Sequence, residues 1–355
     1  MKDIDQIDKN FKVETNIDKE DICFYDVEDG VFQIYGVFKE NGMFRRMPEN
    51  VASSVNPGVY ALHTNTAGGR LRFVTNSSYV AIKTEYSPCR KPHFALTGSS
   101  GFDMYSEWEG SNRYEGTFIP PVDVIDGYES ILEFQNKKER IITIHFPLYS
   151  DVRKLYIGLQ KDATLKTAPE YKIQKPVVYY GSSITQGACA SKPGSCYQSI
   201  LSRRFDCDYI NLGFAGSARG EETMANYIKS LDMSLFVLDY DHNAPTAAKL
   251  EETHNRFFEI IRKELPTLPI VIMPRPRYYH RGEDDKRFEV VKNTYLNAKA
   301  KGDEHVYFIS NTELMSLVED NGSVDNTHPT DSGFLSMANA IGNVFEEIFQ
   351  KQKYI

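Results

Sequence analysis

The chain has 355 residues, which is long for one hydrophobic core and ample for two. It is 41% hydrophobic and 25% charged, as folded domains are, and this excludes a disordered chain. The formal net charge of -8 argues against a nucleic-acid partner, because such partners are bound by clustered Lys and Arg, and it favours a neutral substrate.

The first 20 residues, MKDIDQIDKNFKVETNIDKE, alternate in charge and contain no apolar stretch of the kind found in signal peptides. No window of the chain reaches the roughly 18 apolar residues that a membrane-spanning helix needs. We therefore expect a cytoplasmic location and no membrane partner. The five cysteines are scattered and form no C-x-x-C pair, which favours reduced thiols over a disulfide framework or a zinc site.

Between about residues 30 and 159, short segments rich in aromatic and β-branched residues alternate with turn residues such as Gly68-Gly69 and Asp126-Gly127. No long helical pattern interrupts them. The pattern predicts an antiparallel β-sandwich, of jelly-roll-like form, in an N-terminal domain of residues 1–165. The β-like segments are GVFQIYGVF, GVYALHT, LRFVTNSSYVAIKTEY, HFALTG, ILEFQNKKERIITIHF and VRKLYIGL.

The segment KDATLKTAPEYKIQK, residues 161–175, loses this alternation and contains a proline, so we place a linker at residues 166–175. From residue 176 to 355, apolar runs suited to buried strands alternate with amphipathic stretches. Five strands and five helices are expected, which predicts a parallel three-layer α/β domain. The strands are PVVYYG, YINLGF, LFVLDY, PIVIMP and VYFIS; the helices are YQSILSRRF, EETMANYIKSL, TAAKLEETHNRFFEIIRKEL, DKRFEVVKNTYLNAKAK and SGFLSMANAIGNVFEEIFQK.

Open parallel sheets carry their chemistry at the carboxyl ends of their strands. Small or polar residues follow each predicted strand at this edge. They are Gly181-Ser182-Ser183, Gly213-Phe214-Ala215-Gly216, Asp241-His242-Asn243, Arg275-Pro276-Arg277 and, near the last strand-to-helix junction, Asp325-Asn326-Thr327-His328.

These residue types suit attack by a serine on a carbonyl carbon. A serine hydroxyl needs a base to take its proton and a third group to hold that base. The spacing Asp325-x-x-His328 supplies an imidazole and a carboxylate from one loop, and either Ser182 or Ser183 supplies the hydroxyl. A Gly-Ser-Ser turn alone is more often a helix cap, so the prediction depends on finding all the parts in one domain.

The developing oxyanion would also need donors held in place beforehand. The backbone N–H of Gly216, the side-chain amide of Asn243 and the N–H of the serine turn come from three different strand ends. We expect these three donors to converge on one point.

In order and spacing, the motifs GSSITQG, NLGFAG, DYDHNAP and DNTHPTDSGF resemble those of the SGNH, or GDSL, family of hydrolases. The resemblance implies a flavodoxin-like α/β domain without a cofactor or a catalytic metal. It implies Ser183 as nucleophile, His328 as base and Asp325 as the partner of that base. Ser183, Gly216 and Asn243 would then form the oxyanion hole.

Two positions depart from the family pattern. Ser182 stands where the family usually has Asp, and Asp241 stands where a glycine is common. In the N-terminal half, GFDMY, residues 101–105, is similar to the Gly-x-Asp-Leu-Tyr signature of a β-sandwich domain found ahead of one carbohydrate-esterase-like branch of SGNH esterases.

Several other residues have two interpretations each. Arg219 and Glu221 follow the second motif and either contact substrate or form a surface ion pair; His242 is either a substrate contact or a rim residue. Arg275 and Arg277 either line the crevice or pack between domains. Trp108 is either a platform for a sugar or an anchor between domains. The histidines outside the catalytic motifs show no metal-ligand spacing.

These observations predict a serine esterase that removes a short acyl group. The resemblance to the carbohydrate-esterase-like branch, together with the expected cytoplasmic location, implies acetyl as first choice and a carbohydrate or similar hydroxylated substrate. The alternatives are an acyltransferase with the same three residues, a lysophospholipase or thioesterase with a long acyl channel, and a carbohydrate-binding protein without catalysis. The expected partner is a small-molecule or oligosaccharide ester. Assembly as a homo-oligomer stays open.

Overall fold

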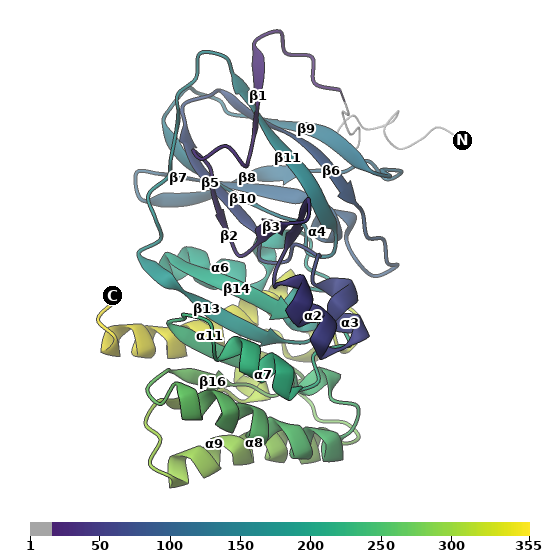
Figure 1. The fold of residues 1–355 in the computed structure, drawn as a ribbon, viewed down its shortest axis with the longest axis vertical. Coiled ribbons are helices and arrows are strands. Elements are labelled where there is room, and N and C mark those ends of the chain that lie inside the picture. Colours follow the sequence, from purple (N-terminus) through teal and green to yellow (C-terminus); the bar gives the residue numbers. More distant parts are fainter. Residues whose placement is uncertain (1–15) are drawn as a thin grey trace.

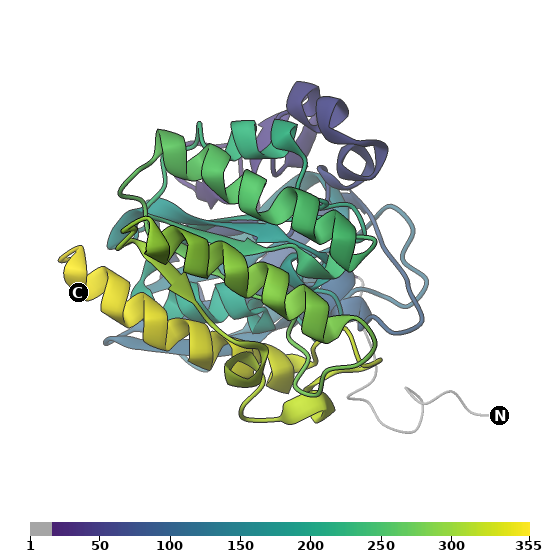
Figure 2. The same ribbon diagram turned by 90° about the horizontal axis from the view of Figure 1, so that it is seen from below.

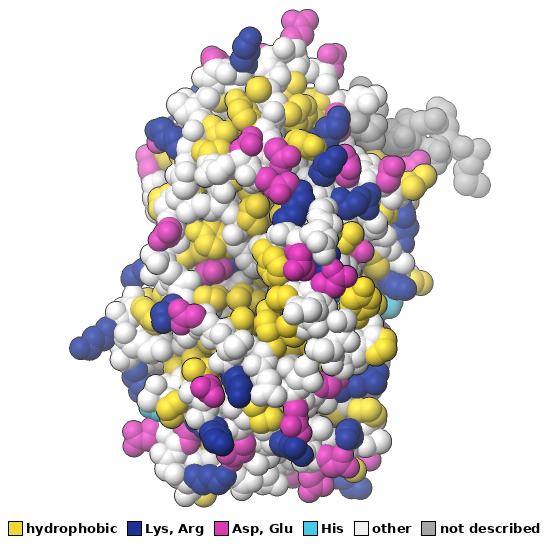
Figure 3. All heavy atoms as spheres, in the orientation of Figure 1, with side chains coloured by type: hydrophobic (Ala, Val, Ile, Leu, Met, Phe, Trp, Pro, Cys, Tyr) yellow, Lys and Arg dark blue, Asp and Glu magenta, His cyan; other side chains and the backbone are white. Residues whose placement is uncertain are grey.

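In the computed structural model, residues 16–355 are described, so the first 15 residues of the predicted N-terminal domain lie outside the described residues. Figure 1 shows two antiparallel sheets in the N-terminal half lying above an α/β layer structure in the C-terminal half. No helix within residues 16–355 is long and apolar enough to cross a lipid bilayer. On the face drawn in Figure 3, acidic and basic side chains are interspersed.

The N-terminal half is the predicted β-sandwich. Its two sheets enclose a core of aromatic and aliphatic side chains, among them Phe73, Ile82, Phe102 and Ile157. One sheet has the order β1-β11-β6-β9, and the other has the order β12-β5-β10-β7-β8 with β2 paired to β5. The strands are β1 (Ile22–Asp26), β2 (Gln33–Tyr35), β5 (Arg70–Thr75), β6 (Tyr79–Ser87), β7 (Phe102–Trp108), β8 (Ser111–Phe118), β9 (Gly127–Glu133), β10 (Arg140–His145), β11 (Asp151–Gln160) and β12 (Leu165–Lys166). A hairpin of β3 (Phe38–Glu40) and β4 (Met43–Arg45) forms a separate two-stranded sheet.

Two segments that the sequence predicts as β-like are helical. GVYALHT falls mostly in α3 (Pro57–Leu62), which follows α2 (Glu49–Val55). The Asn56 side chain accepts hydrogen bonds from the N–H groups of Gly58 and Val59, and Pro57 occupies the first helical position, so a cap overrides the β-branched composition. HFALTG ends in α4 (Leu96–Ser99), where a β-carbon on Gly98 would lie 2.0 Å from the carbonyl oxygen of Ala190, a contact that the sequence pattern does not show.

The C-terminal half is the predicted parallel α/β domain. Its sheet has the order β14-β13-β15-β16-β17, the flavodoxin-like order in which all strands are parallel and the order of the strands reverses at β13. The five strands match the five predicted apolar runs, and most of their residues are buried. They are β13 (Ile173–Gly181), β14 (Cys207–Gly213), β15 (Leu235–Asp239), β16 (Ile270–Ile272) and β17 (Val306–Phe308).

The five predicted helices cover both faces of this sheet, and Figure 2 shows the layers from below. One face packs on α6 (Tyr197–Phe205) and α11 (Asp331–Lys351). The other packs on α7 (Glu222–Ile228), α8 (Ala247–Glu264) and α9 (Asp284–Ala300). The short elements are α5 (Ser183–Gln186), α10 (Asn311–Leu314) and the 3-10 turns η2 (Pro193–Ser195), η3 (Asp241–Asn243) and η4 (Glu319–Gly322).

The sandwich lies against the β14 edge of the parallel sheet, held there by two buried arginines. Arg46 donates hydrogen bonds to the carbonyl oxygens of Asn211 (3.1 Å) and Gly213 (2.5 Å) in β14. Arg70 pairs with Asp208 and lies 3.7 Å from the ring centroid of Tyr209. Unpaired strand edges are exposed to association with other strands, and these contacts cover this one.

The GFDMY segment forms a second connection between the halves. The buried carboxylate of Asp103, in β7, accepts hydrogen bonds from the Nδ1 of His145 (2.9 Å) and from the backbone N–H of Gly194 in η2 (2.8 Å). The signature aspartate therefore joins the sandwich to the loop that precedes α6.

The segment predicted as a linker contributes residues both to a sheet of the sandwich and to the parallel sheet. Leu165 and Lys166 form β12, which pairs with β5 of the sandwich, and Ile173 pairs with Cys207 of the parallel sheet. The domain bounds stay a prediction. Trp108, considered above as an anchor between domains, instead ends β7 in a hairpin with β8, where the Nζ of Lys138 lies 3.5 Å from its ring centroid.

Candidate active site

The ends of three neighbouring strands are level at the carboxyl edge of the sheet. Gly181 of β13 pairs with Gly213 of β14 on one side and with Asp239 of β15 on the other. The segments that follow these three strands therefore begin side by side at the carboxyl edge of the sheet. The order of the strands switches between β13 and β15, and ligands bind at this point in such sheets.

The serine turn assigns different roles to its two hydroxyls. Ser182 is the N-cap of α5, and its buried side chain accepts a hydrogen bond from the N–H of Ile184 at 3.1 Å. Ser183 opens the helix and is partly exposed. Gly181 is needed just before them, because a β-carbon there would lie 2.0 Å from Thr185 Oγ1 and 2.3 Å from the carbonyl oxygen of Asp239.

Ser183, His328 and Asp325 form one chain of hydrogen bonds. The Oγ of Ser183 lies 2.9 Å from the Nε2 of His328, and the Nδ1 of His328 lies 2.8 Å from the Oδ2 of Asp325. The other carboxylate oxygen of Asp325 accepts from the backbone N–H groups of Thr327 (3.1 Å) and His328 (2.9 Å). This is the arrangement of a nucleophile, a base and a group that orients the base.

The charge state of Asp325 suits this arrangement. Burial by itself raises the pKa of the carboxyl, but hydrogen bonds from the backbone and the ring of His328 outweigh it, and the pKa lies below its ordinary value. The carboxylate is therefore ionised at neutral pH. It can accept the Nδ1 proton and stabilise an imidazolium at His328.

The second and third motifs are joined to the serine turn through backbone atoms. The N–H of Phe214 donates to the carbonyl oxygen of Gly181 at 2.9 Å, and the side-chain amide of Asn243 donates to the carbonyl oxygen of Phe214 at 2.8 Å. Gly216 adopts a positive φ of 67°, which glycine reaches without strain. Within residues 16–355, no acceptor is hydrogen-bonded to the backbone N–H of Ser183 or Gly216.

Two buried residues that the sequence analysis missed support the turn. Gln186 accepts from the N–H of Ala215 at 3.0 Å and donates to Asn65 of the sandwich at 3.1 Å. Asp239 accepts from the hydroxyls of Thr185 (2.9 Å) and Tyr197 (3.1 Å). Burial raises the pKa of Asp239 to about 7 despite these two hydrogen bonds. Neither residue has a local sequence signal, because their partners lie on other elements.

Asp241, the departure from the third motif, is a buried anchor. It pairs with Arg287 at 2.9 Å and with Arg275 at 3.4 Å, and Arg275 also pairs with Asp284 at 3.0 Å. Arg277 donates to the backbone oxygen of Asn326 at 3.1 Å. The two arginines therefore hold the loops of the C-terminal half, and packing between the domains does not explain them.

The three residues considered as substrate contacts occupy different surroundings. Glu221 accepts from Asn56 of the sandwich at 2.6 Å and from the hydroxyl of Tyr180 at 3.1 Å, and its side chain forms no ion pair with Arg219. Arg219 is exposed, and its guanidinium lies 3.2 Å from the carbonyl oxygen of Gly216. Burial, followed by the charge of the neighbouring Arg275, lowers the pKa of His242 to about 3, so its ring is neutral. A substrate contact stays a prediction for all three.

The sandwich also contributes side chains to the crevice, a point on which the sequence is silent. The hydroxyl of Tyr149 donates to the carbonyl oxygen of Ser183 at 3.2 Å. The ring of Phe94 packs on Tyr149 with centroids 4.7 Å apart, and the ring of His93 lies 5.6 Å from that of His328. The N-terminal half therefore forms part of the wall around the serine.

Both halves of the chain match models of known families. Residues 174–346 match the model of the GDSL-like lipase/acylhydrolase family, and residues 22–165 match the model for the N-terminus of SGNH hydrolase-type esterases, named GxDLY. No curated protein matches the chain.

Solved structures share the fold over nearly the whole chain. A putative GDSL-like lipase from Bacteroides ovatus is 26% identical with a TM-score of 0.84, and the match covers 93% of this chain and 98% of that one. A salicylyl-acyltransferase from a tetracycline biosynthetic pathway is 19% identical with a TM-score of 0.72 and the same coverage. A family two carbohydrate esterase from Cellvibrio japonicus is 13% identical with a TM-score of 0.60, again with the same coverage.

Proposed function

Because the chain belongs to the SGNH, or GDSL-like, hydrolase family, in the branch with a GxDLY N-terminal domain, we propose that it is a serine esterase that uses Ser183, His328 and Asp325. We further propose that it removes an acetyl group from a hydroxylated substrate such as a carbohydrate. The observation that carries the proposal is the unbroken hydrogen-bond chain from Ser183 Oγ through His328 to Asp325.

In the first step, the Ser183 oxygen attacks the ester carbonyl while the Nε2 of His328 accepts the hydroxyl proton. Asp325, ionised and hydrogen-bonded to Nδ1, stabilises the imidazolium that forms. The oxyanion receives hydrogen bonds from the N–H groups of Ser183 and Gly216 and from the amide of Asn243. His328 then protonates the leaving alcohol, and a water that it deprotonates releases the acyl group from Ser183.

The first test compares two neighbouring serines on an activated acetyl ester. Ser183→Ala is expected to lose essentially all turnover, because within residues 16–355 no other hydroxyl is hydrogen-bonded to the Nε2 of His328. Ser182→Ala is the matched control: it loses the cap of α5, which costs about 1 kcal/mol of stability, and it keeps turnover. Turnover in Ser183→Ala with an intact fold would contradict the proposal.

The acetyl and carbohydrate parts of the proposal are motivated by the fold shared with a carbohydrate esterase, and each has its own test. A series of model esters with lengthening acyl chains tests the first part: rates should fall with chain length, and a preference for long chains would favour a lysophospholipase or thioesterase. Release of acetate from acetylated oligosaccharides tests the second part.

The acyltransferase alternative uses the same three residues and is favoured by one observation, the overall fold shared with a salicylyl-acyltransferase. Product analysis with and without an added alcohol distinguishes the two reactions. An esterase gives free acid in both cases, whereas a transferase gives a new ester with the alcohol.

A further inference from the structure

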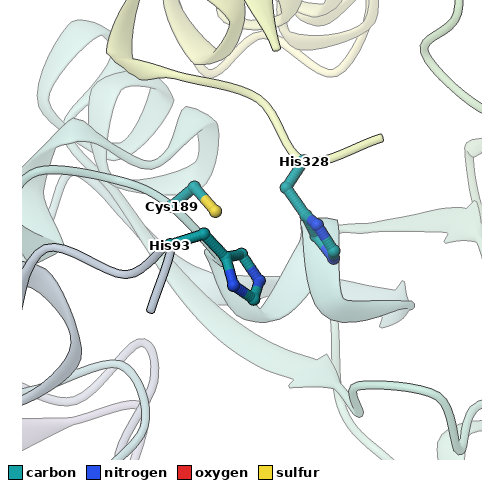
Figure 4. Close-up of side chains that lie close together, drawn as sticks. All are labelled: His93, Cys189 and His328. Atoms are coloured by element: carbon teal, nitrogen blue, oxygen red, sulfur yellow. The ribbon is translucent and has the colours of Figure 1, made fainter. Parts of the chain in front are cut away.

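Three side chains that bind soft metal ions meet beside Ser183. One donor atom each from His93, Cys189 and His328 lies within 4.8 Å of the other two. Figure 4 shows the three side chains around one space, with His93 and Cys189 on one side and His328 on the other. They come from three segments: the sandwich loop before α4, the turn after α5 and the loop before α11.

His328 is oriented to bind a cation as well as to serve Ser183. Its Nδ1 is engaged by the carboxylate of Asp325 at 2.8 Å, so the lone pair of the imidazole lies on Nε2. Histidines that bind metal usually donate their other ring N–H to a carboxylate or a carbonyl, which fixes the tautomer and strengthens the ligand. Asp325 therefore already provides the carboxylate partner that a metal-bound His328 would need.

His93 and Cys189 are free to take the other two positions. Among the described residues, neither the ring of His93 nor the thiol of Cys189 forms a hydrogen bond. The ring of His93 is supported by the edge of Phe94, with centroids 4.7 Å apart. Cys189 has a positive φ of 70°, a conformation that is uncommon for a residue other than glycine and that marks positions with a function more often than others.

The chemistry of the three donors favours one class of ion. Two imidazoles and a thiolate are ligands for Zn²⁺ and similar thiophilic divalent cations, and three protein ligands leave one tetrahedral position for water. Tetrahedral bonds of the usual lengths place such donors about 3.3 to 3.6 Å apart. Because the donor atoms lie within 4.8 Å of one another, they need to approach by up to about 1.5 Å. His93 is exposed and can supply this movement. The thiolate and Asp325 together balance the charge of the ion.

We propose that His93, Cys189 and His328 bind a thiophilic divalent cation such as Zn²⁺ and that the bound cation switches off ester hydrolysis. Binding replaces the S–H bond of Cys189 with a sulfur–metal bond and releases the proton to solvent, without a change in oxidation state. The Nε2 of His328 cannot hold the cation and accept the Ser183 proton at once, so the two functions exclude each other. The proposed inhibition rests on the proposed function, whereas the proposed metal binding does not.

Binding is tested by titrating the metal-free protein with Co²⁺, which shows a thiolate-to-cobalt absorption in the near ultraviolet when a cysteine ligates it. The band is expected in the wild type and in Ser183→Ala, which has no turnover, and Zn²⁺ should displace it. It should vanish in Cys189→Ser, whereas His93→Ala should weaken binding at least about tenfold. The matched controls are Cys23→Ser, in β1, and His305→Ala, just before β17; both should bind as the wild type does.

Inhibition is tested by ester hydrolysis in the presence of Zn²⁺, with reversal by a chelator. Cys189→Ser should keep the basal rate, and Cys189→Ser and His93→Ala should each tolerate at least about tenfold more Zn²⁺, measured relative to the variant's own rate without metal. Absence of the cobalt band in the wild type, or variants that match the wild type, would overturn the site. Binding without inhibition in an active enzyme would overturn the switch. If no ester is hydrolysed at all, the proposed function fails, while the cobalt spectrum still decides the binding site.

Discussion

At the scale of single residues, two neighbouring serines with the same side chain have different surroundings. The hydroxyl of Ser182 accepts a backbone hydrogen bond and is buried, and the hydroxyl of Ser183 lies on the imidazole of His328. Ser182 stands where the family usually has Asp, and both residue types cap helices well. The departure therefore changes the chemistry of the cap and leaves the position of Ser183 intact.

Asn243→Ala should lower kcat about a hundredfold or more, with little change in KM. The reason is that an oxyanion donor acts mainly in the transition state, where the charge develops. Steady-state kinetics on an activated acetyl ester measures the two constants separately. Asn293→Ala, an exposed position on α9, is the control and should behave as the wild type does. A rise in KM alone would assign Asn243 to substrate binding instead.

Asp239→Asn should change how stability depends on pH. Burial raises the pKa of Asp239 to about 7, from an ordinary value near 3.9, so the folded chain holds a proton that the unfolded chain releases. This group therefore stabilises the fold fully below about pH 4, and the contribution is lost as pH rises through about 7. Thermal unfolding between pH 4.5 and 8 should show the wild type losing stability relative to Asp239→Asn. Parallel curves for the two proteins would contradict this.

At the scale of elements, the candidate site depends on three strands that end level with one another. The pairing of Gly181 with Gly213 and with Asp239 sets that register. The five parallel strands were predictable from sequence because strands buried on both faces consist of continuous apolar runs. The helix α3 was not, because GVYALHT has the composition of a strand, and only the cap at Asn56 and Pro57 indicates a helix.

Asp103→Ala should destabilise the fold by at least about 2 kcal/mol. The substitution removes the acceptor of two buried donors, His145 Nδ1 and the N–H of Gly194, which then lack a partner. Urea unfolding measures the change, and Asp123→Ala, an exposed turn position in the same half, should fall within about 0.5 kcal/mol of the wild type. Equal losses in both variants would mean that Asp103 does not connect the two halves.

At the scale of the whole molecule, the site is built from segments far apart in the chain. Ser183 and His328 are separated by 145 positions, and Tyr149, Phe94 and His93 come from the other half. Family-like motifs made the proximity of Ser183, Asp325 and His328 predictable from sequence, and the oxyanion roles of Gly216 and Asn243 stay predictions. Gln186, Asp239 and the sandwich residues were not predictable, because each owes its position to contacts between elements that leave no spacing in the sequence.

Folding brings the hydroxyl of Ser183 to the imidazole of His328, and the proposed catalysis depends on this contact. The most direct measurement is the reaction of the native chain with a serine-directed fluorophosphonate, followed by peptide mass spectrometry. We predict one adduct, on Ser183, that is absent from urea-unfolded chain and from His328→Ala. An adduct on another residue, or equal labelling of Ser183 in folded wild type and folded His328→Ala, would contradict the account.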